Sequence, residues 1–478
     1  MSLATDNKLE RLFYPKNIAV IGASPKSGAF LFGGNGFILG SIKLNFQGGI
    51  YPVHPSAERI LGYKSYKNIL EIPEDIDLAI FSVPRSVVLS VMRDCVKKRV
   101  KFVHIFTAGF SETDRKENTE IEKELLSIAH KGGIRILGPN CMGIYCPEGG
   151  LSWSNDFSRK PGTIGFVSQS GQLATQFIEQ CKHHGLRISK TISFGNASDL
   201  QCHDFINYLA QDEKTKVIGS YVEGMKSGRS FFEAAKGVTL TKPLVVWKGG
   251  QTEGGSRATQ SHTAAIAGSP QIWQSLCKQT GIISVNSIDE MVFTISALQK
   301  TILPKGRNAA ILGGAGGGSV TMTDAAEREG LKVPQLSADT IKSLEEFIPI
   351  EGSSVKNPLD IMPALFNEDH FKEVFALLRY DPNIDVIIFT QQMDTIYGIG
   401  GRRLLDAFIA LTLEVIVNLN KPIFIILQRS LTLEGEALRQ EALGKYNRAN
   451  IPTFESFQSA FRTVYNMNQY QNFLSSRR

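Results

Sequence analysis

Short apolar runs recur along the chain, and each ends in small or polar residues before a stretch with helical periodicity. Short buried strands that alternate with helices are typical of parallel α/β folds. In the first part of the chain, such runs occupy residues 17–21, 49–53, 78–83, 102–106 and 134–137. We therefore predict one doubly wound parallel sheet within residues 1–145.

The same pattern recurs twice further along the chain. Residues 146–161 are polar and contain several Gly and Pro residues, which predicts a linker. Further strands are predicted at residues 163–167, 188–194, 217–222, 244–247, 282–285, 309–312, 386–390, 422–427 and 453–454. A bridging helix is predicted at residues 288–303. The 478 residues would then form three consecutive parallel α/β domains, at about 150 residues per domain.

Composition and charge exclude several classes of protein. The net charge of +6 is spread without a run of like charges, so we expect a mildly basic cleft for a small anion and no nucleic-acid interface. No signal peptide is recognisable, and no apolar run reaches the roughly 18 residues of a membrane helix, so the expected location is the cytoplasm. The six cysteines form no CxxC pair, and no metal-ligand spacing is found, so no metal site is expected.

Small and polar residues follow the strands of the first sheet, at the edge where open parallel sheets bind ligands. Gly22, Ala23 and Ser24 follow the first strand, where backbone N–H groups could hold a phosphate, although a plain tight turn is an equal alternative. The GxGxxG pattern is missing, and the second strand ends at His54 instead of an acidic residue. Both features count against NAD, whereas coenzyme A stays open.

The last strand of the first sheet ends in a Gly-Pro-Asn turn, which Cys141 follows. We expect Cys141 at the carboxyl edge of the sheet. Its thiol could be reactive, could line a binding site or could fill the core, and these alternatives stay open.

Two motifs end strands of the second predicted sheet. Ser168, Gln169, Ser170 and Gly171 lie between a strand and a helix, where N–H groups and two hydroxyls could hold a phosphoryl group. A serine N-cap would explain only one of the two serines. Glu223 also follows a strand; its carboxylate could orient a histidine, or it could be a solvated loop residue.

A glycine-rich stretch at residues 248–268 contains His262. Such a loop can move, and its small residues leave room for a bulky group. A mobile imidazole at a sheet edge suits nucleophilic catalysis or group carriage, which favours a functional His262 over a structural one. A second glycine-rich loop, residues 313–318, could bind a ligand or pack closely on a neighbour, and both alternatives stay open.

Taken in order, these motifs resemble those of the nucleoside-diphosphate-forming acyl-CoA synthetases, the superfamily of succinyl-CoA synthetase. The resemblance is greatest to α subunits of ADP-forming acetate–CoA ligases. Residues 261–268 read SHTAAIAG, where the family usually has SHTGALAG with a phosphorylated histidine, so Ala264 replaces a common glycine. Further matching motifs lie at residues 22–24, 82–84, 107–110, 138–141, 168–171, 221–224 and 357–360.

The resemblance implies a Rossmann-like CoA-binding domain at residues 1–150 and two flavodoxin-like CoA-ligase domains at 151–300 and 301–478. It implies that His262 is phosphorylated, that Glu223 pairs with its imidazole, and that residues 168–171 hold the phosphoryl group. The residues implied in CoA binding are Gly22, Ala23, Ser24, Ser82, Val83, Pro84, Thr107, Ala108, Gly109, Asn140 and Cys141.

The implied reaction converts acyl-CoA, ADP and phosphate reversibly into a carboxylic acid, CoA and ATP, through an acyl phosphate and a phosphohistidine. The ATP-grasp module of this family has no counterpart in the chain. We therefore expect a separate ATP-grasp β subunit, in an α2β2 heterotetramer, to bind ATP or ADP with Mg²⁺. No motif identifies the small carboxylic acid. The alternative function is a non-catalytic CoA-binding or regulatory protein.

Overall fold

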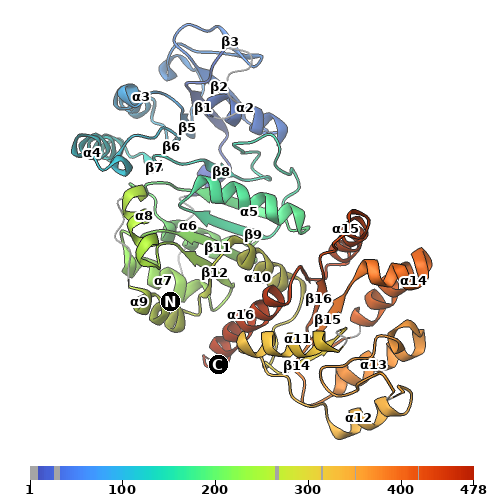
Figure 1. Cartoon of the computed structure of the whole chain (residues 1–478). Coiled ribbons are helices and arrows are strands. Elements are labelled where there is room, and N and C mark those ends of the chain that lie inside the picture. Colours follow the sequence, from blue (N-terminus) through green and yellow to red (C-terminus); the bar gives the residue numbers. More distant parts are fainter. Residues whose placement is uncertain are drawn as a thin grey trace. The chain divides into compact units, whose positions relative to one another are not determined.

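The computed structural model describes residues 9–25, 33–263, 269–313, 316–349, 351–417 and 419–477, without the side chains of residues 260–263. The chain divides into two compact units, Met1–Ile288 and Asp289–Arg478, called unit 1 and unit 2 below. Figure 1 shows the course of the chain through the helices and sheets of each unit. No helix among the described residues is both long and apolar enough to cross a bilayer.

The first sheet of unit 1 has five parallel strands in the order β2-β1-β5-β6-β7. The strands are β1 (Asn17–Ile21), β2 (Gly49–Val53), β5 (Leu78–Phe81), β6 (Phe102–Ile105) and β7 (Arg135–Leu137). The helices that connect these strands are α2 (Gly34–Lys43), α3 (Arg85–Lys98), the short η3 (Ser111–Thr113) and α4 (Lys116–Lys131). The smaller elements are α1 (Glu10–Phe13), the hairpin of β3 (Arg59–Ile60) and β4 (Tyr63–Lys64), and η2 (Ile69–Glu71). The doubly wound parallel sheet predicted for this part of the chain is confirmed.

The second sheet of unit 1 has six strands in the order β13-β12-β11-β9-β10-β8. They are β8 (Gly143–Tyr145), β9 (Ile164–Ser168), β10 (Ile188–Ser193), β11 (Val217–Val222), β12 (Leu244–Lys248) and β13 (Ile283–Val285). Only β8 is antiparallel, where it pairs with β10. The helices are α5 (Gly171–His183), α6 (Cys202–Gln211), α7 (Gly228–Val238), α8 (Glu253–Thr263) and α9 (Pro270–Thr280).

The segment predicted as a linker, residues 146–161, is instead packed into unit 1. Its Trp153 and Phe157 are 2% and 5% exposed, and both rings make edge-to-face contacts with Tyr145 of β8. The prediction was wrong because it weighed the many polar residues of the segment, whereas two large aromatic side chains are enough to anchor it.

Unit 2 contains one parallel sheet in the order β14-β15-β16-β17. Its strands are β14 (Ala309–Leu312), β15 (Val386–Gln391), β16 (Ile423–Leu427) and β17 (Thr453–Phe454). The helices are α10 (Ile288–Lys300, which begins at the last residue of unit 1), α11 (Gly317–Arg328), α12 (Ala338–Glu345), α13 (Glu368–Tyr380), α14 (Met393–Val417), α15 (Leu433–Arg448) and α16 (Phe457–Ser475), with the short η4 (Ala364–Phe366).

Helices cover both faces of the sheet in unit 2. Alternate strand residues enter two separate core clusters: Ile311 and Ile388 pack with α10, α11 and α16, whereas Leu312 and Phe389 pack with α12 to α15. Side chains alternate between the two faces of a strand, so an apolar run without polar interruptions marks a strand that is buried on both faces.

Candidate active site

The loops after β1 and β5 approach each other closely at the carboxyl edge of the first sheet. Gly22 has φ +96°, and a Cβ atom on it would lie 2.2 Å from the carbonyl oxygen of Ser82, so only glycine fits there. The hydroxyl of Ser82 accepts a hydrogen bond from the backbone N–H of Gly34 at the start of α2, at 3.0 Å. Bare backbone therefore meets a helix N-terminus at this point, which is the arrangement that phosphate groups favour.

The loops after β5, β6 and β7 are also joined at this edge. The hydroxyl of Thr107 donates to the carbonyl of Val83 at 2.7 Å, and the N–H of Asn140 donates to the carbonyl of Thr107 at 3.0 Å. The guanidinium of Arg85 donates to the carbonyl of Gly109 at 2.6 Å. The residues predicted to contact CoA thus lie on neighbouring loops, and their role in CoA binding stays a prediction.

Cys141 is buried below this edge, at 4% exposure. Burial raises the pKa of its thiol above the ordinary value, and its Sγ atom lies 3.8 Å from the carbonyl oxygen of Ile105. A thiol whose pKa is raised by burial is a poor nucleophile, so among the alternatives the structure favours a packing role over a reactive one.

A buried histidine supports the same loop from beneath. The ring of His104, on β6, donates from Nε2 to the carbonyl of Cys141 at 3.0 Å. Burial lowers the pKa of His104 to about 4, so the ring is neutral near neutral pH. Its single ring proton must then lie on Nε2, because the carbonyl oxygen can only accept. Sequence analysis missed His104 because a histidine within a strand carries no recognisable signal.

In the second sheet, Gln169 ties the loop after β9 to the loop after β11. Its side-chain oxygen accepts from the N–H groups of Glu223 and Gly224, at 2.8 and 3.2 Å. Ser170 is the N-cap of α5 and accepts from the N–H of Leu173 at 3.3 Å, while the hydroxyl of Ser168 donates to the carbonyl of Ser170 at 2.6 Å. Both serines therefore shape the start of α5, and phosphoryl binding there stays a prediction.

Glu223 is a buried residue, at 7% exposure, and not a solvated one. The hydroxyl of Tyr221 donates to its Oε1 atom at 3.1 Å. The ammonium of Lys248, at the end of β12, donates to the carbonyl oxygens of Glu223 and Gly249. Burial lowers the pKa of Lys248, and the nearby carboxylate of Glu223 opposes that shift. These contacts give the carboxylate a fixed position at the carboxyl edge of the sheet.

The stretch predicted as a glycine-rich loop forms helix α8 as far as Thr263, so that prediction was wrong over residues 253–263. The hydroxyl of Thr252 accepts from the N–H of Gly255, and Glu253 pairs with Arg257 one turn later. These start signals outweigh the two glycines in the first turn. His262 lies in the last turn of α8, and its side chain lies outside the described part of the structure, as do residues 264–268.

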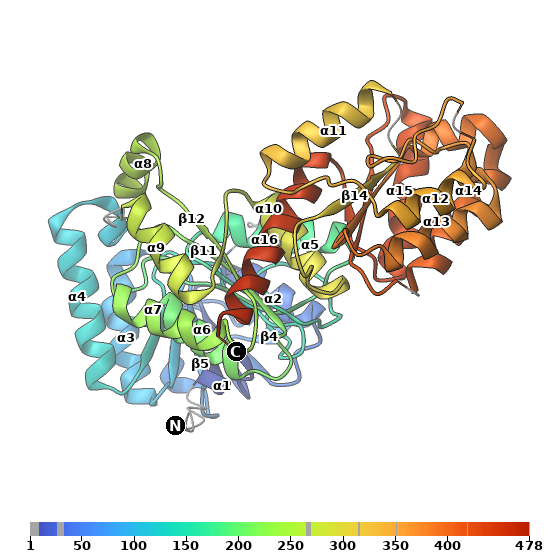
Figure 2. The same ribbon diagram turned by 90° about the horizontal axis from the view of Figure 1, so that it is seen from below.

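Helix α8 lies against η3, which follows the loop of Thr107, Ala108 and Gly109. Figures 1 and 2 both place α8 next to α4 at this side of the first sheet. The helix that contains His262 therefore begins at the edge of the second sheet and runs beside the edge of the first. A group on α8 is well placed to act between the two edges.

A hydrogen-bonded network that sequence analysis missed joins these edges. The amide of Asn196, in the loop after β10, donates to Glu112 of η3 at 2.6 Å and to Glu122 of α4 at 3.2 Å. Glu112 accepts in turn from the N–H groups of Gly109 and Phe110. Asn196 is 84 residues from Glu112 and 74 residues from Glu122 in sequence, so no local pattern could reveal these contacts.

Comparisons with known proteins define the class. A family model described as "CoA binding domain" matches residues 16–147, and one described as "Succinyl-CoA ligase like flavodoxin domain" matches residues 161–298. The chain belongs to the family of ADP-forming acyl-CoA ligases, which are acid–thiol ligases. This confirms the family resemblance and the α/β fold class.

Within that family, the chain is similar to an acetate–CoA ligase [ADP-forming] II subunit alpha of Pyrococcus furiosus, with 38% identity over 94% of both chains. It is 32% identical to a 4-hydroxybutyrate–CoA ligase [ADP-forming] of Nitrosopumilus maritimus, over 97% of this chain but only 64% of that longer one. A solved acetyl-coenzyme A synthetase of Candidatus Korarchaeum cryptofilum, in complex with phosphate and ADP, matches with a TM-score of 0.83 and 30% identity over 98% of both chains. These relatives favour a catalytic chain over a non-catalytic CoA-binding protein.

Proposed function

We propose that this chain is the α subunit of an ADP-forming acyl-CoA ligase. The overall reaction is acyl-CoA, ADP and phosphate giving carboxylic acid, CoA and ATP, reversibly. The observation that carries the proposal is the position of α8: the helix with His262 leaves the second sheet beside Glu223 and runs along η3 of the first sheet. The imidazole of His262 could thus accept a phosphoryl group at the carboxyl edge of the first sheet and pass it to a nucleotide bound by another subunit.

The first sheet would bind CoA, whose thiol is the acyl carrier. The N-terminus of α2, which begins at Gly34 beside Ser82, supports this, because a helix N-terminus at the carboxyl edge of a sheet suits a phosphate group. The tied loops with Thr107, Gly109 and Asn140 would hold the rest of the molecule. Phosphate would attack the thioester carbonyl, and the thiolate of CoA would leave as the acyl phosphate forms.

His262 would then take the phosphoryl group from the acyl phosphate and release the carboxylate. An imidazole with an ordinary pKa near 6.5 is largely neutral at physiological pH and can attack phosphorus. The N-terminus of α5, which starts at Gly171, would stabilise the phosphoryl charge. The carboxylate of Glu223, held by Tyr221, would stabilise the positive charge that forms on the ring.

The second half of the reaction would need a partner. The P. furiosus relative is named as a subunit alpha, and the N. maritimus relative, whose name has no subunit designation, is longer than this chain. We infer an ATP-grasp β subunit that binds ADP or ATP with Mg²⁺, in an α2β2 heterotetramer, and receives the phosphoryl group from His262. Related ligases act on acetate or 4-hydroxybutyrate, so the carboxylic acid must be found by a substrate screen.

The test is phosphorylation of the complex of both subunits with radiolabelled ATP and Mg²⁺. The proposal expects an acid-labile, alkali-stable label on this chain that His262→Ala abolishes. His183→Ala, which removes an exposed histidine in the last turn of α5, is the matched control and should label like the wild type. Labelling of the His262→Ala variant would refute the assignment.

A further inference from the structure

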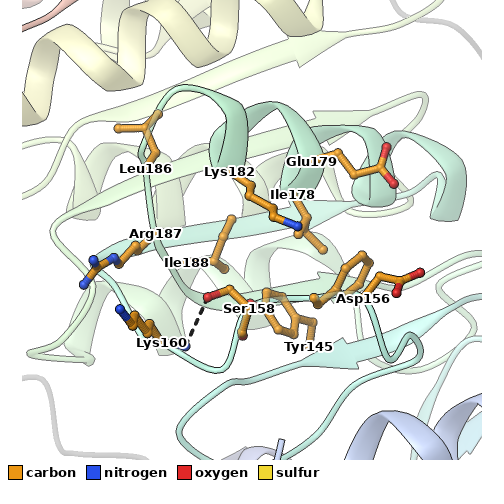
Figure 3. Close-up of a pocket in the computed structure, with 11 residues that line it drawn as sticks. Tyr145, Asp156, Ser158, Lys160, Ile178, Glu179, Lys182, Leu186, Arg187 and Ile188 are labelled. Carbon is orange, nitrogen blue, oxygen red and sulfur yellow. Dashed lines mark hydrogen bonds between the residues drawn. The ribbon is translucent and has the colours of Figure 1, made fainter. Parts of the chain in front are cut away.

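A small pocket lies at the end of α5 away from the predicted phosphoryl site. It has a volume of about 80 Å³ and is formed by the last turns of α5, the start of β10, Tyr145 of β8 and the segment 156–160 (Figure 3). Lys182 lies twelve positions after Ser170, the N-cap of α5, which at 1.5 Å per residue is about 18 Å. The pocket is therefore distinct from the candidate active site.

The base of the pocket is apolar. Tyr145, Phe157, Ile178 and Ile188 are all buried and line it. The hydroxyl of Tyr145 donates to the carbonyl of Ser158 at 2.7 Å, so the phenol already has an acceptor within the protein. The base therefore suits a small branched or aliphatic group that makes no hydrogen bonds.

The rim carries charges of both signs. Figure 3 shows the side chain of Lys182 extending over the pocket, with Lys160 and Arg187 on one side and Asp156 and Glu179 on the other. Within the described part of the chain, none of these five side chains has an ion pair or a side-chain hydrogen bond. Lys182 and Glu179 remain unpaired although three residues apart on one helix, where such pairs commonly form.

We propose that this pocket binds a small apolar α-amino acid, at a site that the proposed ligase reaction does not use. The carboxylate of the amino acid lies at Lys182, its ammonium lies towards Asp156 and Glu179, and its side chain packs against Tyr145, Ile178 and Ile188. A simple anion would be attracted by the cationic side chains and repelled by the carboxylates of Asp156 and Glu179. A zwitterion can pair its carboxylate with the cations and its ammonium with the carboxylates. The volume limits the ligand to a short side chain such as that of valine.

Trp153 offers a direct signal for binding. Its ring centroid lies 5.3 Å from that of Phe157 and 6.4 Å from that of Tyr145, two rings that line the pocket. The experiment is titration of the full chain with L-valine while tryptophan emission is followed. Isovalerate, which lacks the ammonium, and isobutylamine, which lacks the carboxylate, are the matched probes. We expect a saturable change with valine, and affinities about tenfold lower for each analogue.

Variants separate this pocket from any other site. Lys182→Ala and Glu179→Gln each change an exposed side chain and should lower the affinity for valine about tenfold. Arg159→Ala removes a neighbouring exposed cation that does not line the pocket and should leave the affinity unchanged. The proposal is overturned if valine gives no saturable change, if isovalerate binds as tightly as valine, or if both pocket variants bind valine like the wild type. None of these readouts depends on ligase activity.

Discussion

The carboxyl edges of the sheets in unit 1 and unit 2 are built from the same strand–loop–helix pattern. Side chains tie loops at both edges, as Gln392 does with Gln428 in unit 2, but the glycine-rich loop of unit 2 is held by fewer contacts. In unit 1, side chains tie neighbouring loops together, as Gln169 does for Glu223 and Asn196 does for Glu112. In unit 2, the described part of the glycine-rich loop has one such tie, from the N–H of Gly316 to Asp360 at 2.9 Å. A Cβ atom at Gly318 would meet nothing within 4 Å.

This difference separates two uses of glycine that look alike in sequence. At the edge in unit 1, glycine allows backbones to approach each other, so the position of each loop depends on its neighbours. At the edge in unit 2 both uses occur: Gly313, with φ +89°, packs onto the carbonyl of Thr390 as Gly22 packs onto that of Ser82, whereas Gly318 has free space around it. Substitution should therefore be costly at Gly22 and tolerated at Gly318.

Glu223→Gln should have the largest effect in unit 1. The amide can still accept from Tyr221, so the fold should persist, but the negative charge opposite the phosphorylated ring is lost. We expect the rate of phosphorylation of His262 to fall about 100-fold, as for the loss of one preorganised electrostatic partner. Rapid-quench labelling of the complex measures this rate, and an unchanged rate would remove Glu223 from the proposed mechanism.

His104 should make the stability of unit 1 depend on pH. Its pKa is about 4 in the folded protein and about 6.5 when unfolded, so the unfolded state binds the proton first as the pH falls. Its contribution to stability is complete above the unfolded pKa and decreases as the pH falls towards 4, by about 3 kcal/mol in total.

All three tryptophans lie in unit 1, so their emission during urea unfolding follows that unit. His104→Gln keeps a donor for the carbonyl of Cys141 and removes the titration. The variant should lose less stability than the wild type between pH 6.5 and pH 4. Equal losses in the two proteins would show that other groups dominate the acid sensitivity.

Gly22→Ala tests the close approach at the first sheet. The new methyl group would overlap the carbonyl of Ser82, and the alanine backbone would have to keep an unfavourable positive φ. We therefore expect the free energy of unfolding of unit 1 to fall by about 2 kcal/mol. Gly237→Ala, within α7, is the matched control, because no atom lies within 4 Å of the new group. The control should be neutral or up to about 1 kcal/mol more stable. Urea unfolding followed by tryptophan emission distinguishes these results.

Most of the sheet architecture could be predicted from sequence, whereas many of the hydrogen bonds that hold the loops of the candidate site could not. The apolar runs at residues 18–21 of β1 and 386–389 of β15 are buried, which makes the positions of these strands plain. The motif around Ser168 also gave the start of α5, because a strand followed by an N-cap is a local signal. Asn196 and His104 act through partners distant in sequence. Helix α8 was predicted as a loop because its two glycines were given more weight than the contact between Thr252 and Gly255 at its start.

Gly318→Ala should have the smallest effect and sets the lower end of the comparison. Gly318 lies in the first turn of α11, and the added methyl group has open space around it. Alanine restricts the unfolded chain, so we expect α11 to become more stable by a few tenths of a kcal/mol. Hydrogen exchange of the α11 amides, measured by mass spectrometry, reports on this helix although unit 2 has no tryptophan. Faster exchange in the variant would mean that the surroundings of Gly318 are as constrained as those of Gly22, and the contrast between the two glycines would fail.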